Sequence, residues 1–309
     1  MGRAPVASGA YITAEGGYQF IDRADAIGHG ISSTGLIEGP TTDTAIGAHG
    51  GWGAGASIGF ASSGPIVTGL PFTRAEIYVS FFEADDTQSD TVADPAKTTL
   101  KSVDGSALGV IGVTATSEMQ RRASESGVRF AFDQDAGPDT SLTLVVTPFL
   151  RNAREDTDTV AIGTVDTAWR SANVETWQYG ITVAIEPEVR ISSTVALVGR
   201  IGGGIYGYSA DASFASRSTA PVPDPFLATL ADSDTGVGFR GVFGAGIKLT
   251  LAPGMQLTGY AEADYLSNTG RAILPDNQFT SATTSTLGSD DGWEFRAGAR
   301  VSLALGSGQ

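Results

Sequence analysis

The stretch that decides the fold is Gly236-Val-Gly-Phe-Arg-Gly-Val-Phe-Gly-Ala-Gly-Ile-Lys-Leu-Thr-Leu251. Its odd-numbered positions are almost all apolar, whereas its two cations, Arg240 and Lys248, stand at even-numbered positions. Successive side chains of a β-strand point to opposite faces, so a period of two separates these sets. The sequence therefore predicts a strand with one apolar face and one face that carries the charge.

The same alternation recurs along the chain and predicts ten strands. They are expected near residues 10–20, 46–61, 72–82, 120–133, 141–152, 174–186, 189–208, 236–251, 255–266 and 292–305. Four connections, near residues 62–70, 135–140, 186–188 and 251–255, are short and rich in turn residues, and the other five are far longer. Alternating short and long connections are typical of a transmembrane β-barrel. We therefore expect an all-β transmembrane antiparallel barrel of about ten strands, with long outer loops and short periplasmic turns.

Twelve strands is the alternative count, because one further apolar stretch does not fit the alternation. Ala107-Leu-Gly-Val-Ile-Gly-Val-Thr114 has strand-like composition. Counting it alone would give eleven strands and would place the two termini on opposite sides of the membrane. We assign residues 105–117 to the second outer loop, as a hairpin or lid.

Composition limits the class of protein. The 309 residues include 41 glycines and no cysteine, and their net charge is −15. Abundant glycine disfavours a helical bundle. A membrane helix needs about 18 consecutive apolar residues, and no apolar run in the sequence is that long. Excess negative charge argues against a nucleic-acid partner. We expect one domain over residues 1–309, with tails at 1–9 and 306–309. The start of the chain lacks the apolar core of a signal peptide, so we expect the signal peptide to be absent from this chain.

Aromatic residues distinguish a membrane barrel from a soluble sandwich, for which alternation alone would look the same. Many aromatics on the apolar faces fall near the ends of the predicted strands, where they would meet the lipid headgroups. The predicted outer aromatic girdle is Tyr18, Phe20, Phe81, Trp177, Tyr179, Phe239, Tyr265, Trp293 and Phe295. This placement favours the membrane barrel over a sandwich whose core would hold the aromatics at strand centres.

The opposite faces carry cations and acids in phase, which predicts an ion-paired lumen. The predicted lumen charge network consists of Glu15, Arg74, Glu76, Arg129, Arg200, Arg240, Lys248, Glu262, Asp264, Glu294, Arg296 and Arg300. Glycines at 47, 51, 53, 55 and 59 on the second predicted strand would leave room for long side chains that cross from other strands. A barrel of ten strands is barely wider than one that its own side chains fill. We expect a packed lumen.

The sequence offers little for catalysis or metal binding. Histidine occurs only as His29, in the first predicted outer loop, and as His49, on the second predicted strand. We interpret His49 as a hydrogen-bonding lumen residue. The Asp85-Asp86 pair resembles the aspartates of outer-membrane proteases with ten-stranded barrels, but no Asp stands within two residues of either His. We expect no enzyme, no catalytic residue, no metal and no cofactor.

Three stretches resemble strands of porin-like Gram-negative outer-membrane β-barrels. They are Ala10-Tyr-Ile-Thr-Ala-Glu-Gly-Gly-Tyr-Gln-Phe20, Gly51-Trp-Gly-Ala-Gly-Ala-Ser-Ile-Gly-Phe60 and Arg74-Ala-Glu-Ile-Tyr-Val-Ser-Phe81. The closing stretch from Gly292 to Leu303 is similar in style, and the whole pattern broadly resembles the Legionella-type major outer-membrane-protein family. Many such proteins end in an aromatic residue that the assembly machinery recognises, whereas this chain ends in Leu305-Gly-Ser-Gly-Gln309.

These observations predict an integral protein of the outer membrane of a Gram-negative bacterium. Its expected role is that of a surface or structural protein or a restricted small-solute channel. A general diffusion porin is the alternative within the class, and a secreted, soluble, lectin-like binding module is the alternative outside it. The expected partners are outer-membrane lipid and lipopolysaccharide, the barrel-assembly machinery and, as an open alternative, further copies of the chain.

Overall fold

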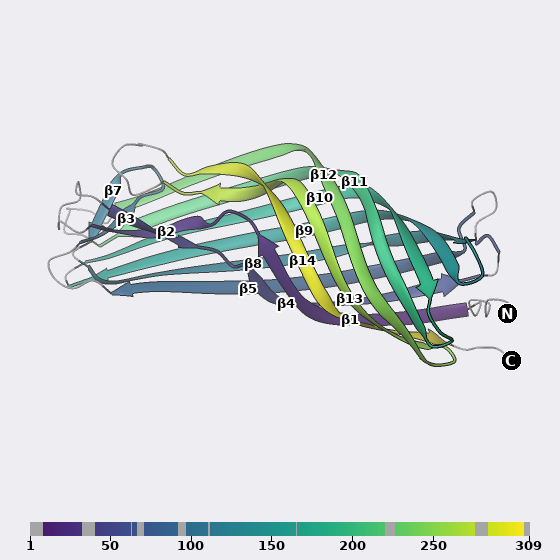
Figure 1. The fold of residues 1–309 in the computed structure, drawn as a ribbon. Helices are drawn as coiled ribbons and strands as arrows, with labels where there is room; N and C mark the ends of the chain where they lie inside the picture. The colour runs from purple at the N-terminus through teal and green to yellow at the C-terminus, as the bar shows by residue number, and fades with distance from the viewer. Residues whose placement is uncertain are drawn as a thin grey trace.

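A computed structural model describes residues 9–32, 41–62, 64–66, 71–91, 97–110, 112–164, 166–219, 226–275 and 284–305. Ten strands form a closed barrel in the order β1-β14-β13-β12-β11-β10-β9-β8-β5-β4. Figure 1 shows the barrel from the side. Their bounds are β1 Gly9–Asp22, β4 Gly50–Ala61, β5 Arg74–Thr91, β8 Gly112–Asp135, β9 Thr140–Gly163, β10 Thr167–Arg190, β11 Val195–Ser218, β12 Phe226–Ala252, β13 Met255–Ile273 and β14 Thr286–Leu305. The expected tails, apart from Gly9 in β1, lie outside the described residues.

All neighbouring strands of the barrel are antiparallel, and β1 closes the ring on β14 from Ala10↔Leu305 to Asp22↔Trp293. The first and last described strands begin and end at the same end of the barrel as the short turns (Figure 1). The ten-stranded antiparallel barrel predicted from alternation is thus confirmed. No helix in the described part of the chain is long and apolar enough to cross a membrane.

The strands are longer than the alternation predicted, mainly at the end away from the termini. Strands β8 to β11 have 24 residues each and β12 has 27, whereas a tilted membrane strand needs about 9–11. Much of the sequence that we assigned to outer loops therefore extends the barrel wall, and residues 164–166 alone connect β9 to β10. The turn predicted at residues 186–188 was wrong. Strand β10 runs through Pro187 to Arg190, and the turn lies at residues 191–194.

The half of the barrel near the termini, which we call the inner half, has an apolar exterior. Five apolar side chains on four of its strands are each more than half exposed, namely Ile58, Ile77, Ile201, Phe239 and Ile247. Exposed apolar side chains around a closed barrel suit a lipid environment and would be unstable in water. Closure also leaves no unpaired strand edge in this half, as a membrane span requires.

The opposite half, which we call the outer half, is built differently because two strands stop early. The last β1–β4 pair is Phe20↔Gly50 and the last β4–β5 pair is Gly51↔Ala84. Strand β5 continues to Thr91, and β8 to β12 continue with it. These six strands form a curved wall beyond the outer aromatics. Strand β13 separates from β12 above Leu266, at a bulge where Asn268 has φ 55°.

A second, four-stranded sheet in the order β3-β2-β6-β7 packs inside this wall. Its bounds are β2 Ala26–Ser32, β3 Thr41–Ile46, β6 Lys97–Lys101 and β7 Ala107–Val110. Leu100 and Leu108 pack on wall alanines such as Ala161, and all three are buried. We call this the small sheet. The predicted hairpin at residues 105–117 is therefore split, since Ala107–Val110 belong to the small sheet and residues from Gly112 onward begin wall strand β8.

Candidate functional site: a charged lumen beneath an internal sheet

The lumen of the inner half holds ion pairs in successive layers along its axis. Near the termini, Arg74 pairs with Asp133 at 2.9 Å, and Lys248 pairs with Glu188. The next layer contains the pair of Arg129 with Glu76, at 3.0 Å. Tyr11 also donates its hydroxyl to Glu76, and its ring lies against Gly59, where a Cβ atom would clash. The glycine at position 59 thus provides the space for a crossing side chain that the sequence predicted.

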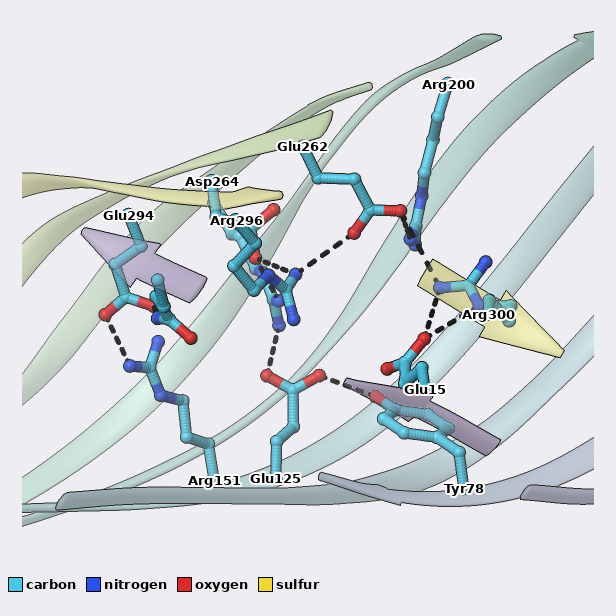
Figure 2. Close-up of polar contacts among 12 residues, drawn as sticks. Glu15, Tyr78, Glu125, Arg151, Arg200, Glu262, Asp264, Glu294, Arg296 and Arg300 are labelled. Carbon is cyan, nitrogen blue, oxygen red and sulfur yellow. Dashed lines mark hydrogen bonds and ion pairs between the residues drawn. The ribbon is translucent and has the colours of Figure 1, made fainter. Parts of the chain in front are cut away.

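A central group of charges is shared among four strands. Glu262 lies 3.4 Å from Arg296, 3.8 Å from Arg300 and 4.0 Å from Arg200. Arg300 also pairs with Glu15 at 2.6 Å. Figure 2 shows these side chains converging on the lumen. Because Arg300 pairs with both Glu262 and Glu15, its removal would take one cation away from each of these carboxylates.

Two contacts of the lumen cross from one wall to the other. Arg240 on β12 donates to Asp264 at 2.6 Å and reaches across to Glu125 on β8 at 2.8 Å. Arg151 on β9 pairs with Glu294 on β14 at 2.5 Å. Four strands separate β9 from β14 around either side of the ring. This second pair therefore spans the full width of the barrel, and the two contacts divide the lumen.

The space left between these side chains is small. A cavity of about 50 Å³ lies beside Arg240, Arg151 and Asp264, and another of about 30 Å³ lies beside Arg151 and Glu155. Since one water needs roughly 10–15 Å³ of such space, each cavity holds only a few waters. Each of these two cavities among the described residues is too small for a hydrated solute.

In the outer half, Arg170 fastens the small sheet to the wall. It is almost fully buried on β10 and donates to the carbonyls of Ile27 and Gly28 at 2.7 Å, and of Lys101 at 3.2 Å. A fourth, longer contact at 3.4 Å reaches Pro275 after β13. Burial lowers the pKa of Arg170 to about 10, which leaves it charged at neutral pH. One guanidinium thus holds the wall, two strands of the small sheet and the β13–β14 connection together.

Both histidines pair with an aspartate in this region. His29 is buried on β2, with Nε2 2.6 Å from Asp90 and Nδ1 2.9 Å from Ser117 Oγ. His49 precedes β4 and has Nε2 2.7 Å from Asp25 and Nδ1 3.0 Å from the carbonyl of Ile21. These partners are distant in sequence or lie in a connection, so the two-residue window used above could not find them.

The predicted aspartate pair does not join either histidine in a shared site. Asp85 is exposed, and Asp86 accepts a long backbone contact from Gly47 at 3.4 Å. Within the described residues no group of three histidine, cysteine or acidic side chains is arranged to hold a metal ion.

The structure places all twelve predicted network residues on the lumen side, each with at least one ion partner. Sequence reasoning missed Tyr78, which donates to Glu125 at 2.7 Å, and Glu155, which lies beyond the predicted strand 141–152 and accepts from Arg121 at 2.8 Å. Tyr78 stands in phase with Arg74 and Glu76, so the period of two could have identified it. Nothing in the sequence marked Arg170, because its partners are all backbone carbonyls.

The nine residues of the predicted aromatic girdle all point out of the barrel. Eight are between 37% and 62% exposed, from Trp293 to Phe239, and Tyr265 is half-buried against the Trp293 ring at 5.3 Å. Tyr265 also donates its hydroxyl to Asp291 at 2.7 Å, an interaction at the polar side of the girdle. The position of these rings defines the border between the inner and outer halves.

No family model matches the chain, and no curated protein matches it. The comparisons therefore give no support to the Legionella-type family. The chain is similar to the outer-membrane protease OmpT of Escherichia coli, with 9% identity over 97% of this chain and 98% of that one and a TM-score of 0.46. It is also similar to the translocator domain of the autotransporter NalP of Neisseria meningitidis, with 14% identity, 96% and 89% coverage and a TM-score of 0.37. A third similar structure is Ail of Yersinia pestis, with 9% identity over 96% of this chain and 99% of that one and a TM-score of 0.24.

Likenesses this distant carry no argument about function, so the class rests on the geometry of the chain itself. The barrel is closed, its inner half is apolar outside and charged inside, and its outward aromatics form a border. A soluble sandwich would have the reverse arrangement. The chain is an outer-membrane β-barrel.

Proposed function

We propose that the protein is a filled outer-membrane barrel that acts as a surface or structural protein, or at most as a restricted channel for small solutes. The observation that carries the proposal is the pair of Arg151 with Glu294 at 2.5 Å, which spans the width of the barrel. The second barrier is the small sheet that Arg170 holds inside the outer half. These two barriers lie in series along the axis, so opening either one leaves the other closed.

The role that we propose is not catalytic, and it needs no cofactor. The polar outer half presents strands β8 to β12 well beyond the aromatic border, which suits contact with the surroundings of the cell. The proposed partners are outer-membrane lipid and lipopolysaccharide at that border and the assembly machinery during insertion. A general diffusion porin is the second candidate, and it would require both barriers to move.

Conductance in a planar lipid bilayer tests this proposal. Four proteins are compared: the unmodified chain, a chain with residues 97–110 replaced by a short Gly-Ser linker, an Arg151→Ala, Glu294→Ala double variant, and the combination of both changes. The structure limits the deletion to residues 97–110, because residues from Gly112 onward form the wall. We expect small or brief openings from the first three proteins and stable openings from the combination.

The control removes an ion pair of the same kind from the outside of the barrel. Arg122 and Glu83 lie 3.0 Å apart and are each over 40% exposed, so their double alanine variant should conduct like the unmodified protein. Large, long-lived openings from the unmodified protein would refute the filled lumen and support the porin. Solubility without detergent, with no change of gel mobility on heating, would refute the membrane barrel itself.

A further inference from the structure

The smaller of the two lumen cavities described above, about 30 Å³, lies between the crossing pair and the base of the outer half. Its walls come from β1 and the residue after it, and from β5, β8, β9, β10, β13 and β14. Three guanidinium groups from inside the barrel line it, those of Arg23, Arg121 and Arg151, together with the carboxylates of Glu155 and Glu294. Two further arginines among the lining residues, 122 and 154, keep half-exposed side chains that pair with acids on the outside of the wall.

Both carboxylates already have strong partners. Arg121 donates to Glu155 at 2.8 Å, and Arg151 pairs with Glu294 at 2.5 Å. Glu294 also accepts a hydrogen bond from Gln19 at 3.2 Å. The two acids are therefore matched by two of the three arginines, and the cavity holds one positive charge more than its walls balance.

Arg23 is the arginine without a matched anion. Its side chain is only 10% exposed, its nearest carboxylate oxygen, on Glu294, is 3.5 Å away, and its buried Nε has no hydrogen-bond partner among the described residues. Burial lowers the pKa of Arg23, the charge of Glu294 opposes this shift, and the charges of Arg151 and Arg121 add to it. An uncompensated buried charge is strongly unfavourable unless another ion joins it.

A second buried polar group faces the same cavity without a partner. Gln178 is 1% exposed, lines the cavity, and its Oε1 has no hydrogen-bond partner. The oxygen and nitrogen of a glutamine amide are assigned from the hydrogen bonds that they make, and an oxygen without a donor favours the turned amide at this position. With its amide turned, Gln178 would present an N–H group to the cavity that Arg23 also lines.

We propose that this cavity binds one small monovalent anion of the size of chloride. The anion would accept from Arg23 Nε and from the Gln178 amide and would balance the third guanidinium. The volume admits a halide or one or two waters and excludes phosphate or a carboxylate ligand. Water alone would fill the space but would leave the charge unbalanced. This inference does not depend on whether the barrel conducts.

The experiment measures thermal unfolding of the full chain in detergent, in sodium chloride and in sodium gluconate at equal ionic strength and pH. A ligand that binds only the folded state raises the melting temperature with its concentration until the site saturates. We expect a saturable rise with chloride and with bromide and no such rise with gluconate. The Arg23→Gln variant should lose the difference between chloride and gluconate. The matched control, Arg122→Gln, replaces an exposed arginine and should keep it.

Crystals grown in bromide provide a measurement that needs no variant. The anomalous difference map should show one peak within hydrogen-bonding distance of Arg23 Nε. Equal melting curves in chloride and gluconate, a chloride response that Arg23→Gln retains, or a cavity without a bromide peak would each overturn the proposal. If Arg23→Gln fails to fold, the bromide peak and the melting curves of the unmodified protein decide the question.

Discussion

The inner and outer halves share the same strands but reverse the direction in which polar and apolar side chains point. In the inner half of β12, Phe239 and Phe243 are exposed and Arg240 is buried. In the outer half of β11 the arrangement is reversed. Phe214 is 2% exposed and packs in a cluster with Val103 of the β6–β7 turn, whereas Asp211 faces out. One strand system thus passes from lipid to water without a break in its hydrogen bonding. Only the side chains differ between the halves, and they determine whether the exterior of each half is stable in lipid or in water.

This contrast between the halves shows that the lumen can be closed in two physically distinct ways. In the inner half, charges that neutralise one another fill the lumen, and their removal leaves unpaired ions. In the outer half, apolar clusters such as Leu100 with Ala161 and Ala168 fill it, as in a water-soluble domain. Replacing a buried arginine should therefore have different consequences in the two halves.

The largest effect is expected where a single side chain holds the two sheets together. Arg170→Ala removes a charged donor from three buried backbone carbonyls, of which Gly28 keeps the hydrogen bond from the Thr159 hydroxyl, so the outer half should lose about 3 kcal/mol. Hydrogen exchange of β2 and β6 amides would measure the loss, which should not extend to β1 and β14. Arg217→Ala, on the exposed face of the neighbouring strand, serves as the control. Uniform loosening of the whole barrel would contradict a division into two halves.

The next effect is a coupling across the lumen. In a double-mutant cycle of Arg151→Ala and Glu294→Ala we expect the two changes to be non-additive by about 2 kcal/mol. The exposed pair Arg122 and Glu83, at a similar distance of 3.0 Å, should give at most about 0.5 kcal/mol. Unfolding in urea from detergent micelles would provide both values. Strict additivity of the lumen pair would show that the two charges do not meet.

The inner half could be predicted from the sequence because lipid and lumen demand opposite residues. Alternating pairs such as Phe239 with Arg240 leave no doubt about the faces. The outer half could not, because both of its faces are wet or weakly apolar. On β9, Thr157 and Thr159 are buried, while the alternate residues Asp158 and Val160 face out, so hydropathy barely alternates. The predicted strands consequently ended where the contrast ended, and the chain beyond was assigned to loops.

The same reason explains which parts of the site were foreseen. Lumen charges can be recognised in the sequence because they stand at every second position of a strand, as Glu262 and Asp264 do. The contacts of Arg170 and of His29 join segments that are 61 or more residues apart in sequence, and their partners are backbone atoms or single aspartates. Only the return of the small sheet into the barrel brings these groups together.

A third prediction concerns labelling and leaves stability unchanged. Single cysteines at Phe239, Phe243 and Ile247 should react with lipid-soluble reagents, because these side chains are 42% to 62% exposed on the apolar exterior. Cysteines at Arg240 and Lys248 should avoid those reagents. The chain has no native cysteine, so no background correction is needed. Labelling that ignores the parity of the residue number would mean that the register of β12 is wrong.

The smallest effect is expected on the outside of the outer half, where acids repel one another. Asp158 faces Glu118 across the β8–β9 pair, and partial burial followed by the charges of Asp156 and Glu118 raises its pKa. A raised pKa in the folded state means that ionisation opposes folding, so this residue lowers stability once the pH exceeds the ordinary value for aspartate, about 4. Asp158→Asn should therefore raise the melting temperature slightly at pH 7 and leave it unchanged at pH 3. An equal gain for Asp158→Asn at both pH values would show that the effect is not electrostatic.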